Sequence, residues 1–370
     1  MCSNFNFEDG VFKDILLKNN CVCILKSFIS NWAPSMWNID SLSQDTLGQI
    51  VTVKIGSPYN GGRVPKETEC SFEEWDLGKF FEFIKGYQDN NKFYYAGYTH
   101  FIHLNETQKN FRSFDWSWAG LSNKDSLDSS LWAGSAGSFT PCHKDSYGCN
   151  LHAQLIGHKE WFLWPPKFNL CPTRFPYEES SIFSKVDVLE KQYTDAAIHI
   201  VASPGDVIFI PKHWWHLARN LDNSVSINTW IDLPSDALDR LKESITRLLV
   251  CSLKKNDRTN IWKNPGEDTG TLEENAVLVE QSLSNLEYEN LPCSDSRHHS
   301  SYKIVRKQVD CSISFENVQF TDFSHAEMAE SKTENVDSVV DSLLNCIVAN
   351  ENTMNDIVSN FLKCRKRNTL

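Results

Sequence analysis

The sequence lacks the features that mark a secreted, zinc-stabilised or membrane-spanning protein. Its 12 cysteines are scattered, and no two of them form a C-x-x-C pair, so no structural zinc site is indicated. No apolar run approaches the roughly twenty residues that a transmembrane helix needs. The N-terminal residues lack the basic and apolar regions of a signal peptide. We therefore expect a soluble protein without a membrane partner, located in the cytoplasm or the nucleus, where thiols stay reduced.

Positive charge is also scarce. The formal net charge is −12 at pH 7, and no basic stripe runs through the central part of the chain. Because phosphate contacts require clustered Lys and Arg, a nucleic-acid partner is not expected. In contrast, hydrophobic residues make up 41% and aromatic residues 12% of the 370 residues. This is enough for one large packed domain plus an appendage.

A possible metal site is the first feature that points to chemistry. His143 and Asp145 stand two positions apart in S-F-T-P-C-H-K-D, and residues i and i+2 of a strand lie on the same face. Further along the chain, the apolar run V-I-F-I lies between a Pro-Gly-Asp turn and Pro211, which predicts a strand that leads towards His216. Two histidines and one carboxylate form the facial triad of non-haem Fe(II) oxygenases, which leaves coordination positions open for other ligands.

Other histidines compete with this interpretation. An isolated H-x-D pair arises by chance in a chain with 11 histidines, so the surrounding residues have to decide. His213 lies near His216 and is its nearest competitor, although the W-W-H context favours His216. His152, His158 and His199 fall in or beside predicted strands, where a histidine is more often a hydrogen-bonded wall residue than a metal ligand.

The context of these positions resembles the JmjC-type, cupin-like Fe(II)/2-oxoglutarate dioxygenases. The resemblance covers roughly residues 10–255 and rests on four stretches: L-W-A-G-S-A-G-S-F-T-P-C-H-K-D (131–145), A-Q-L-I-G-H-K-E-W-F-L-W-P-P (153–166), P-G-D-V-I-F-I-P-K-H-W-W-H (204–216) and S-I-N-T-W (226–230). It implies a mainly β fold with flanking helices, in which a double-stranded β-helix of the jelly-roll, cupin type forms the core. It also implies Fe(II) and 2-oxoglutarate as cofactors.

The resemblance assigns a role to individual residues. It makes His143, Asp145 and His216 the iron ligands. It makes Lys159 the cation that pairs with the distal carboxylate of 2-oxoglutarate, and Thr140 a hydroxyl donor to the same carboxylate. The alternative for Lys159 is the usual one for lysine, a solvated position on the surface.

Three further pocket residues follow from the same resemblance. Asn228 in S-I-N-T-W matches an asparagine that lines the cosubstrate pocket. Tyr95 is expected to supply a phenol to the pocket, with Tyr94 as the alternative. Asn150 matches another pocket asparagine only if one residue is inserted after Asp145, a departure from the family pattern.

The resemblance implies an enzyme, and three classes of function stay open. The favoured class is hydroxylation of a side chain in another protein. The second is an interaction protein that keeps the fold and binds a small heat-shock protein with little or no catalysis. Histone lysine demethylation and hydroxylation of transfer RNA are less favoured, because no chromatin-reading module is visible and the chain is acidic.

The expected organisation has three parts: an N-terminal α/β bracing region (1–100), the JmjC double-stranded β-helix domain with its following helix (101–255), and a C-terminal linker and helical extension (256–370). Within them we expect a strand at 21–26, a strand at 48–55, a helix at 73–87, a loop near the site at 106–130 and the barrel strands from Phe139 to Asp232.

Helices are expected to follow the barrel. From Ser235 to Leu253, leucines and an isoleucine recur on one helical stripe. This stripe either packs on the barrel or forms a homodimer interface, as the resemblance to a dimeric hydroxylase allows. Further helices are expected at 272–288 and from residue 336 onward, with a strand or two between residues 302 and 325.

Overall fold

A computed structural model describes residues 17–18, 20–59, 69–89, 91–104, 111, 113–172 and 181–253, with short helical pieces between 274 and 285 and the strand 318–320. These residues divide into two compact units. One comprises the described residues up to Leu233 together with 318–320, and the other comprises those from Pro234 to residue 285. The helix predicted from residue 336 onward lies outside the described residues.

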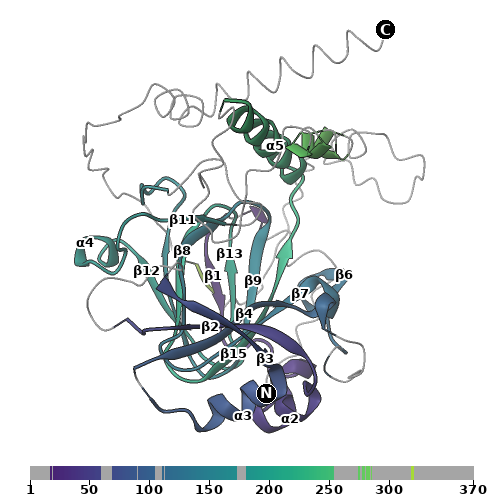
Figure 1. Cartoon of the computed structure of the whole chain (residues 1–370), viewed down its shortest axis with the longest axis vertical. Helices are drawn as coiled ribbons and strands as arrows, with labels where there is room; N and C mark the ends of the chain where they lie inside the picture. The colour runs from purple at the N-terminus through teal and green to yellow at the C-terminus, as the bar shows by residue number, and fades with distance from the viewer. Residues whose placement is uncertain are drawn as a thin grey trace, which may run out of the picture. The chain divides into compact units, whose positions relative to one another are not determined.

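Two antiparallel sheets face one another and form the barrel. Successive strands pass between the sheets, so that each sheet contains strands distant in sequence (Figure 1). The large sheet contains the order β13-β9-β15-β7, formed by Val207–Ile210, Cys149–Ile156, Ser224–Ile231 and Ser129–Gly134. The small sheet contains the order β8-β14-β10-β12, formed by Phe139–Asp145, Trp215–Asn220, Lys159–Trp164 and Ile198–Ala202. This confirms the double-stranded β-helix.

Additional strands widen both sheets. Beyond β7 the large sheet continues with β4 (Phe93–His100), β2 (Ile50–Gly56) and β3 (Ser71–Asp76), and beyond β13 with β1 (Cys23–Leu25) and β16 (Val318–Phe320). The small sheet ends with β11 (Ser181–Phe183), and β5 (Asp115–Trp116) pairs with β6 (Leu121–Asp125). The strand predicted between 302 and 325 is therefore present as β16, and its partner is β1.

The helices are short except for one. The described residues include the α-helices α2 (Ile39–Asp45), α3 (Leu77–Gly86), α4 (Lys191–Thr194) and α5 (Asp236–Leu253). They also include the 3₁₀ helices η1 (Ala33–Met36), η3 (Phe101–His103), η4 (Ser117–Ala119) and η5 (Ser126–Asp128). In Figure 1, α2 and α3 lie side by side near β2 and β3. Among the described residues, no helix is long and apolar enough to span a membrane.

Strand alternation separates two environments on the large sheet. On β9, Leu151, Ala153 and Leu155 belong to the apolar cluster that includes buried residues of α2 and α3. The intervening Asn150 and His152 are buried as well, and because successive side chains point to opposite faces, they point into the barrel. Strand β9 is therefore apolar towards the helices and polar towards the interior, whereas Ile208 and Ile210 of the neighbouring β13 add apolar side chains to the interior.

Asp76 begins α3 because its carboxylate accepts a hydrogen bond from the Lys79 amide at 3.0 Å. The helix prediction for 73–87 is thus too long at its start, since Ser71–Asp76 forms strand β3, paired with β2. The side chains of β3 are exposed or half-buried, so no apolar period distinguishes this strand from the first turn of a helix.

The expected loop at 106–130 is also corrected. It contains strands β5 and β6, and Trp116 is fully buried against Trp32, with ring centroids 4.8 Å apart. Burying an indole of this size favours an ordered hairpin over an open loop. The barrel likewise begins earlier than the predicted Phe139, because Ser129–Gly134 pairs with β15 as its first strand.

The apolar stripe of α5 has an identified partner within its own unit. Leu241 and Ile245 form a buried cluster with Val279 and Leu283 of the following helical pieces. The described part of the stripe is therefore covered by a segment of the same chain, inside the predicted helix 272–288. The dimer interpretation stays a prediction.

Candidate metal centre

His143, Asp145 and His216 lie together in the interior near one end of the small sheet. Their ligand atoms all lie within 4.8 Å of one another. His143 and His216 are register partners on neighbouring strands β8 and β14, with ring centroids 4.2 Å apart. All three side chains are buried. The structure thus brings the predicted triad together, with the donor set that suits Fe(II) in a facial triad.

Backbone carbonyls orient both histidines. The Nδ1 of His143 lies 2.8 Å from the carbonyl oxygen of Pro141, and the Nδ1 of His216 lies 3.0 Å from that of Trp214. A carbonyl oxygen can only accept, so each Nδ1 carries a proton, and Nε2 is the ring atom that remains for a metal. This second layer of contacts fixes the tautomer that binds a metal.

Burial and neighbouring groups shift the pKa values of His216 and Asp145. Burial lowers the pKa of His216 to about 4, so its imidazole is neutral. Burial alone would raise the pKa of Asp145, but hydrogen bonds and charges from His143 and His216 and the indole of Trp230 lower it below its ordinary value. The Nε1–H of Trp230 donates to Oδ2 of Asp145 at 3.1 Å. The carboxylate is therefore ionised and held in place.

Lys159 is buried at the opposite end of the same interior. Its side chain is 1% exposed, which excludes the solvated surface position. Its Nζ donates to Ser226 Oγ at 2.6 Å and lies 3.5 Å from His152 Nε2. Burial lowers the pKa of Lys159 to about 7. Among the described residues no carboxylate pairs with this cation, which leaves its charge available for an added anion.

Thr140 reaches the interior because of a β-bulge. Between His216 and Ala218 the pairing with β8 slips, so that Ala218 faces Thr140 while His216 faces His143. The extra residue shifts the strand's alternation and puts Thr140 on the same face as His143. Its Oγ1 lies 3.3 Å from the hydroxyl of Tyr95. Of the two tyrosines considered, Tyr95 is therefore the one that lies beside Thr140.

Tyr94 lies elsewhere, on the other face of β4. Its ring packs against Trp75 and Phe83, with centroids 5.8 and 4.7 Å away. Strand alternation accounts for this, because neighbouring residues point to opposite faces.

The two asparagines lie side by side. Asn228 Nδ2 donates to Asn150 Oδ1 at 3.0 Å, and Asn228 Oδ1 accepts from the Nε1–H of Trp132 at 2.7 Å. Both asparagines are buried. The structure thus places Asn150 beside Asn228 despite the inserted residue, and the contribution of each to cosubstrate binding stays a prediction.

The competing histidines lie outside the triad. His213 adopts φ 66° before β14, and His199 bonds Glu160 at 2.9 Å. His158 bonds Asp222 at 2.7 Å. Among the described residues, none of them joins the cluster that can hold a metal.

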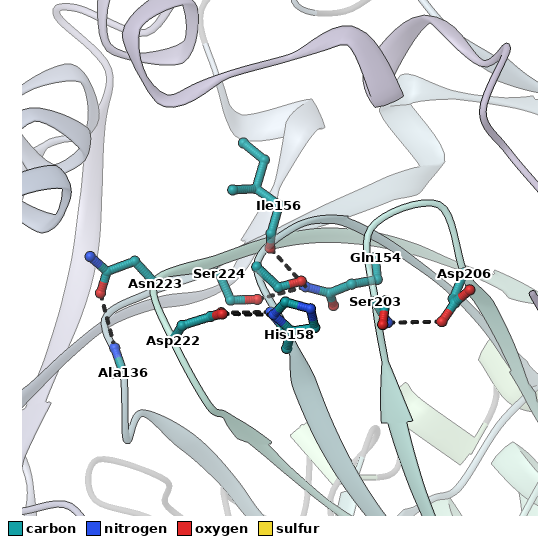
Figure 2. Close-up of polar contacts among 10 residues, drawn as sticks. Ala136, Gln154, Ile156, His158, Ser203, Asp206, Asp222, Asn223 and Ser224 are labelled. Carbon is teal, nitrogen blue, oxygen red and sulfur yellow. Dashed lines mark hydrogen bonds and ion pairs between the residues drawn. The ribbon is translucent and has the colours of Figure 1, made fainter. Parts of the chain in front are cut away.

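Turns close the Lys159 end of the barrel. The carboxylate of Asp222 accepts from the backbone amide and the ring of His158, as Figure 2 shows. His158 lies in the β9–β10 turn and Asp222 in the β14–β15 turn, and each turn crosses from one sheet to the other. Their hydrogen bonds therefore join the two crossings next to Lys159 and Ser226. Gly157 permits the close approach, because it adopts φ 69° and a side chain there would collide with the Asn223 carbonyl.

The triad end bears a group of aromatic side chains. Tyr98 is 44% exposed and packs edge-on against Trp132 and Trp230, with centroids 5.5 and 5.8 Å away. Tyr98 has φ 57° and lies where the pairing of β4 with β7 slips. Bulges of this kind redirect side chains beside active sites. The indoles it touches are those that bond Asp145 and Asn228, so this surface is joined directly to the site.

Residues 9–237 match a family model described as the cupin-like domain. The chain belongs to this family. HSPB1-associated protein 1 of Mus musculus is 38% identical over 321 residues, which span 80% of this chain and 65% of the relative. The Homo sapiens protein of the same name is 39% identical over 286 residues, spanning 70% and 58%. More distant is lysine-specific demethylase 8 of Xenopus tropicalis, 27% identical over 236 residues, spanning 59% and 50%.

These matches confirm the resemblance to cupin-like, JmjC-type proteins. The chain spans 58–65% of the length of the HSPB1-associated relatives named above. Sequence reasoning about this cupin-like domain missed Ser226, Trp132 and Trp230, and treated His152 only as a wall residue. A usable signal was present, because polar and apolar residues alternate in N-L-H-A-Q and in S-V-S-I-N-T-W.

Proposed function

We propose that the protein is an Fe(II)- and 2-oxoglutarate-dependent dioxygenase that hydroxylates a side chain of another protein. The observation that supports this most strongly is the combination of the buried triad with Lys159, a buried cation whose partners among the described residues are neutral. A metal ion complements the first and a carboxylate complements the second. A 2-oxo dicarboxylate joins both chemistries in one molecule.

The roles of the residues follow from their contacts. His143, Asp145 and His216 would hold the iron, which together with 2-oxoglutarate and dioxygen supplies the oxidation of a C–H bond. Lys159 would bind the distal carboxylate, with the hydroxyls of Thr140 and Tyr95 as further donors. Burial of these groups strengthens their charge interactions and keeps water away.

A polypeptide is the substrate class that the site supports best. The half-exposed aromatic side chains Tyr98, Trp132 and Trp230 at the triad end suit the packing of a protein side chain. The net charge of −12 disfavours transfer RNA. Relatives named lysine-specific demethylase are 26–27% identical, so methyl-lysine peptides belong in any substrate screen, with formaldehyde release as the readout.

Thermal unfolding of the purified chain tests the cofactor assignment. With Mn(II) as a redox-silent substitute for iron, 2-oxoglutarate at a hundred times its dissociation constant should stabilise the native state by about 2.7 kcal/mol. We expect this effect only when metal is present, and we expect His143→Ala to abolish it. Stabilisation that is absent in the metal-loaded wild type would contradict the proposal.

A second candidate function rests on the relatives' name. Proteins named HSPB1-associated protein 1 are 37–39% identical to this chain, which supports an interaction protein that binds a small heat-shock protein. An intact triad is not needed for that role. Binding of a purified small heat-shock protein to wild type and to His143→Ala separates the two. The interaction protein is favoured if the wild type and His143→Ala bind the small heat-shock protein equally well and 2-oxoglutarate does not stabilise the wild type.

A further inference from the structure

His152 is a buried histidine inside the barrel that the metal site does not use. It lies on β9, is 3% exposed, and its Nε2 lies 3.5 Å from the Nζ of Lys159. Its ring packs edge-on against Trp161 at 4.8 Å between centroids. The residue therefore borders the cation that the proposed cosubstrate has to reach.

The imidazole of His152 is neutral. Burial, followed by the charges of Lys159 and His216, lowers its pKa well below the ordinary value. With Lys159 protonated, the ammonium can only donate, so Nε2 of His152 accepts and Nδ1 carries the proton. In this state both residues direct polar atoms at one small region of the interior.

Two side chains next to His152 carry polar atoms without partners. The Nε1 of Trp161 and the Oε1 of Gln154 are buried without a hydrogen-bond partner among the described residues. Buried polar groups are nearly always bonded in folded proteins. Gln154 follows His152 in the inward-facing row of β9, and Trp161 packs against the ring of His152. These neighbours thus offer hydrogen-bonding capacity that the described residues do not satisfy.

We propose that His152 is a second contact for the distal carboxylate of the bound 2-oxo dicarboxylate, beside Lys159. This inference rests on the proposed function and adds a residue that selects for the distal carboxylate. A carboxylate accepts only, so Nε2 has to donate to it. The imidazole does so by moving its proton from Nδ1 to Nε2, with no net change in charge. Lys159 keeps its bond to Ser226 and turns its remaining hydrogens to the carboxylate.

Calorimetric titration of the full, Mn(II)-loaded chain tests this contact. His152→Phe keeps a ring of similar size against Trp161 and removes the hydrogen bond, whereas His152→Gln keeps a donor. We compare 2-oxoglutarate with 2-oxopentanoate, which has the same 2-oxo acid head and a methyl group in place of the distal carboxylate. We expect His152→Phe to weaken 2-oxoglutarate about tenfold and to leave 2-oxopentanoate unchanged. We expect His152→Gln to stay within about threefold of the wild type for both.

The outcomes are distinct. If the wild type binds 2-oxoglutarate and His152→Phe binds it equally well, the inference fails and the proposed function stands. If His152→Phe weakens both ligands alike, the residue acts through packing and the inference fails. If the wild type binds no 2-oxoglutarate, the proposed function fails together with the inference. Thermal unfolding without ligand shows whether His152→Phe has kept its fold.

Discussion

The two ends of the barrel interior carry opposite charges. At the triad end, the ionised Asp145 is surrounded by two histidines and the indole of Trp230. At the other end, Lys159 is bonded to a serine and lies beside a histidine. Neither charge has a charged partner of opposite sign from Lys, Arg, Asp or Glu among the described residues. Stability alone does not explain these two charges, because pairing them with each other or substituting apolar side chains would avoid the cost of burying them.

This difference in charge indicates which kind of ligand each end of the interior can bind. An isolated buried charge costs free energy unless something pairs with it. A metal cation would complete the triad end, which has nitrogen and carboxylate donors, and a carboxylate would complete the Lys159 end. The comparison therefore predicts different responses when either charge is removed.

Removing the negative charge should have the largest effect. In Asp145→Asn, the amide still fits beside Trp230 but no longer supplies an anionic ligand. We expect Mn(II) affinity to fall by at least about 100-fold, more than the loss of an outer hydrogen bond causes. Succinate formation from 2-oxoglutarate should fall with it. Isothermal titration with Mn(II) measures the affinity.

His213→Asn is the matched control, because His213 lies near the triad and asparagine tolerates its positive φ. This variant should bind Mn(II) like the wild type. Equal losses in both variants would show that the metal assignment at Asp145 is wrong.

Removing the positive charge should separate binding from stability. In Lys159→Met the metal site is intact, but 2-oxoglutarate affinity should fall roughly 10- to 100-fold, because a charge-assisted hydrogen bond is lost. Without ligand, the same variant should unfold at a higher temperature, with a gain of about 1–3 kcal/mol, since a buried cation without a carboxylate partner is removed. Differential scanning calorimetry and ligand titration measure the two effects.

Lys79→Met, at an exposed position on α3, should change neither quantity. If Lys159→Met instead destabilises the unliganded protein, the chain supplies a counter-charge of its own and the contrast between the two ends is false.

The hydrogen bond from Trp230 should have a smaller effect. Trp230→Phe keeps an aromatic ring near Tyr98 but removes the donor to Asp145 Oδ2. We expect roughly tenfold weaker Mn(II) binding, as is typical for contacts that orient a ligand. Trp164→Phe loses a comparable indole bond, to the Tyr193 carbonyl at 2.9 Å, and should bind Mn(II) normally. If Trp230→Phe binds Mn(II) as tightly as the wild type, Asp145 is oriented by its other neighbours without the indole.

The barrel was expected from the resemblance to the cupin-like family, and the meeting of His143, Asp145 and His216 was expected from their spacing together with that resemblance. His143 and Asp145 share a face because they are two residues apart in a strand, and a strand pattern leads to His216 through a turn. Of the large sheet, the strands at 21–26 and 48–55 were predicted from local patterns, whereas β3 was taken for the start of a helix and β7 was not expected in the barrel. Periodicity detects single strands but not their pairing.

Other parts of the site depend on pairing between distant strands. The bulge that turns Thr140 inward arises from the register of β8 against β14, and no periodicity in β8 indicates it. Whether a carboxylate lies beside Lys159 depends on all the strands that line the interior, so the residues around Lys159 in the sequence do not indicate it. The carbonyls of Pro141 and Trp214 that orient the histidines are backbone groups, so side-chain identity gives no signal for them.

The pH dependence of ligand binding should give the smallest and most specific effect. Burial lowers the pKa of Lys159 from 10.5 to about 7 in the unliganded protein, whereas a bound carboxylate requires the protonated form. From pH 7 to pH 8 the protonated fraction falls about fivefold, so 2-oxoglutarate affinity should fall by about the same factor. Titrations in buffers of different ionisation enthalpy should show proton uptake on binding.

Stability without ligand should change in the opposite direction. Between about pH 7 and the ordinary pKa of 10.5, the unfolded chain holds a proton on Lys159 that the folded chain has released. Because the unfolded state binds more protons, the contribution of this residue to the free energy of unfolding rises with pH across that window and is lowest below pH 7. Lys159→Met removes both effects. If the wild type and Lys159→Met show the same pH dependence of affinity and of stability, Lys159 stays charged in the unliganded protein. The chain would then supply a carboxylate that pairs with Lys159.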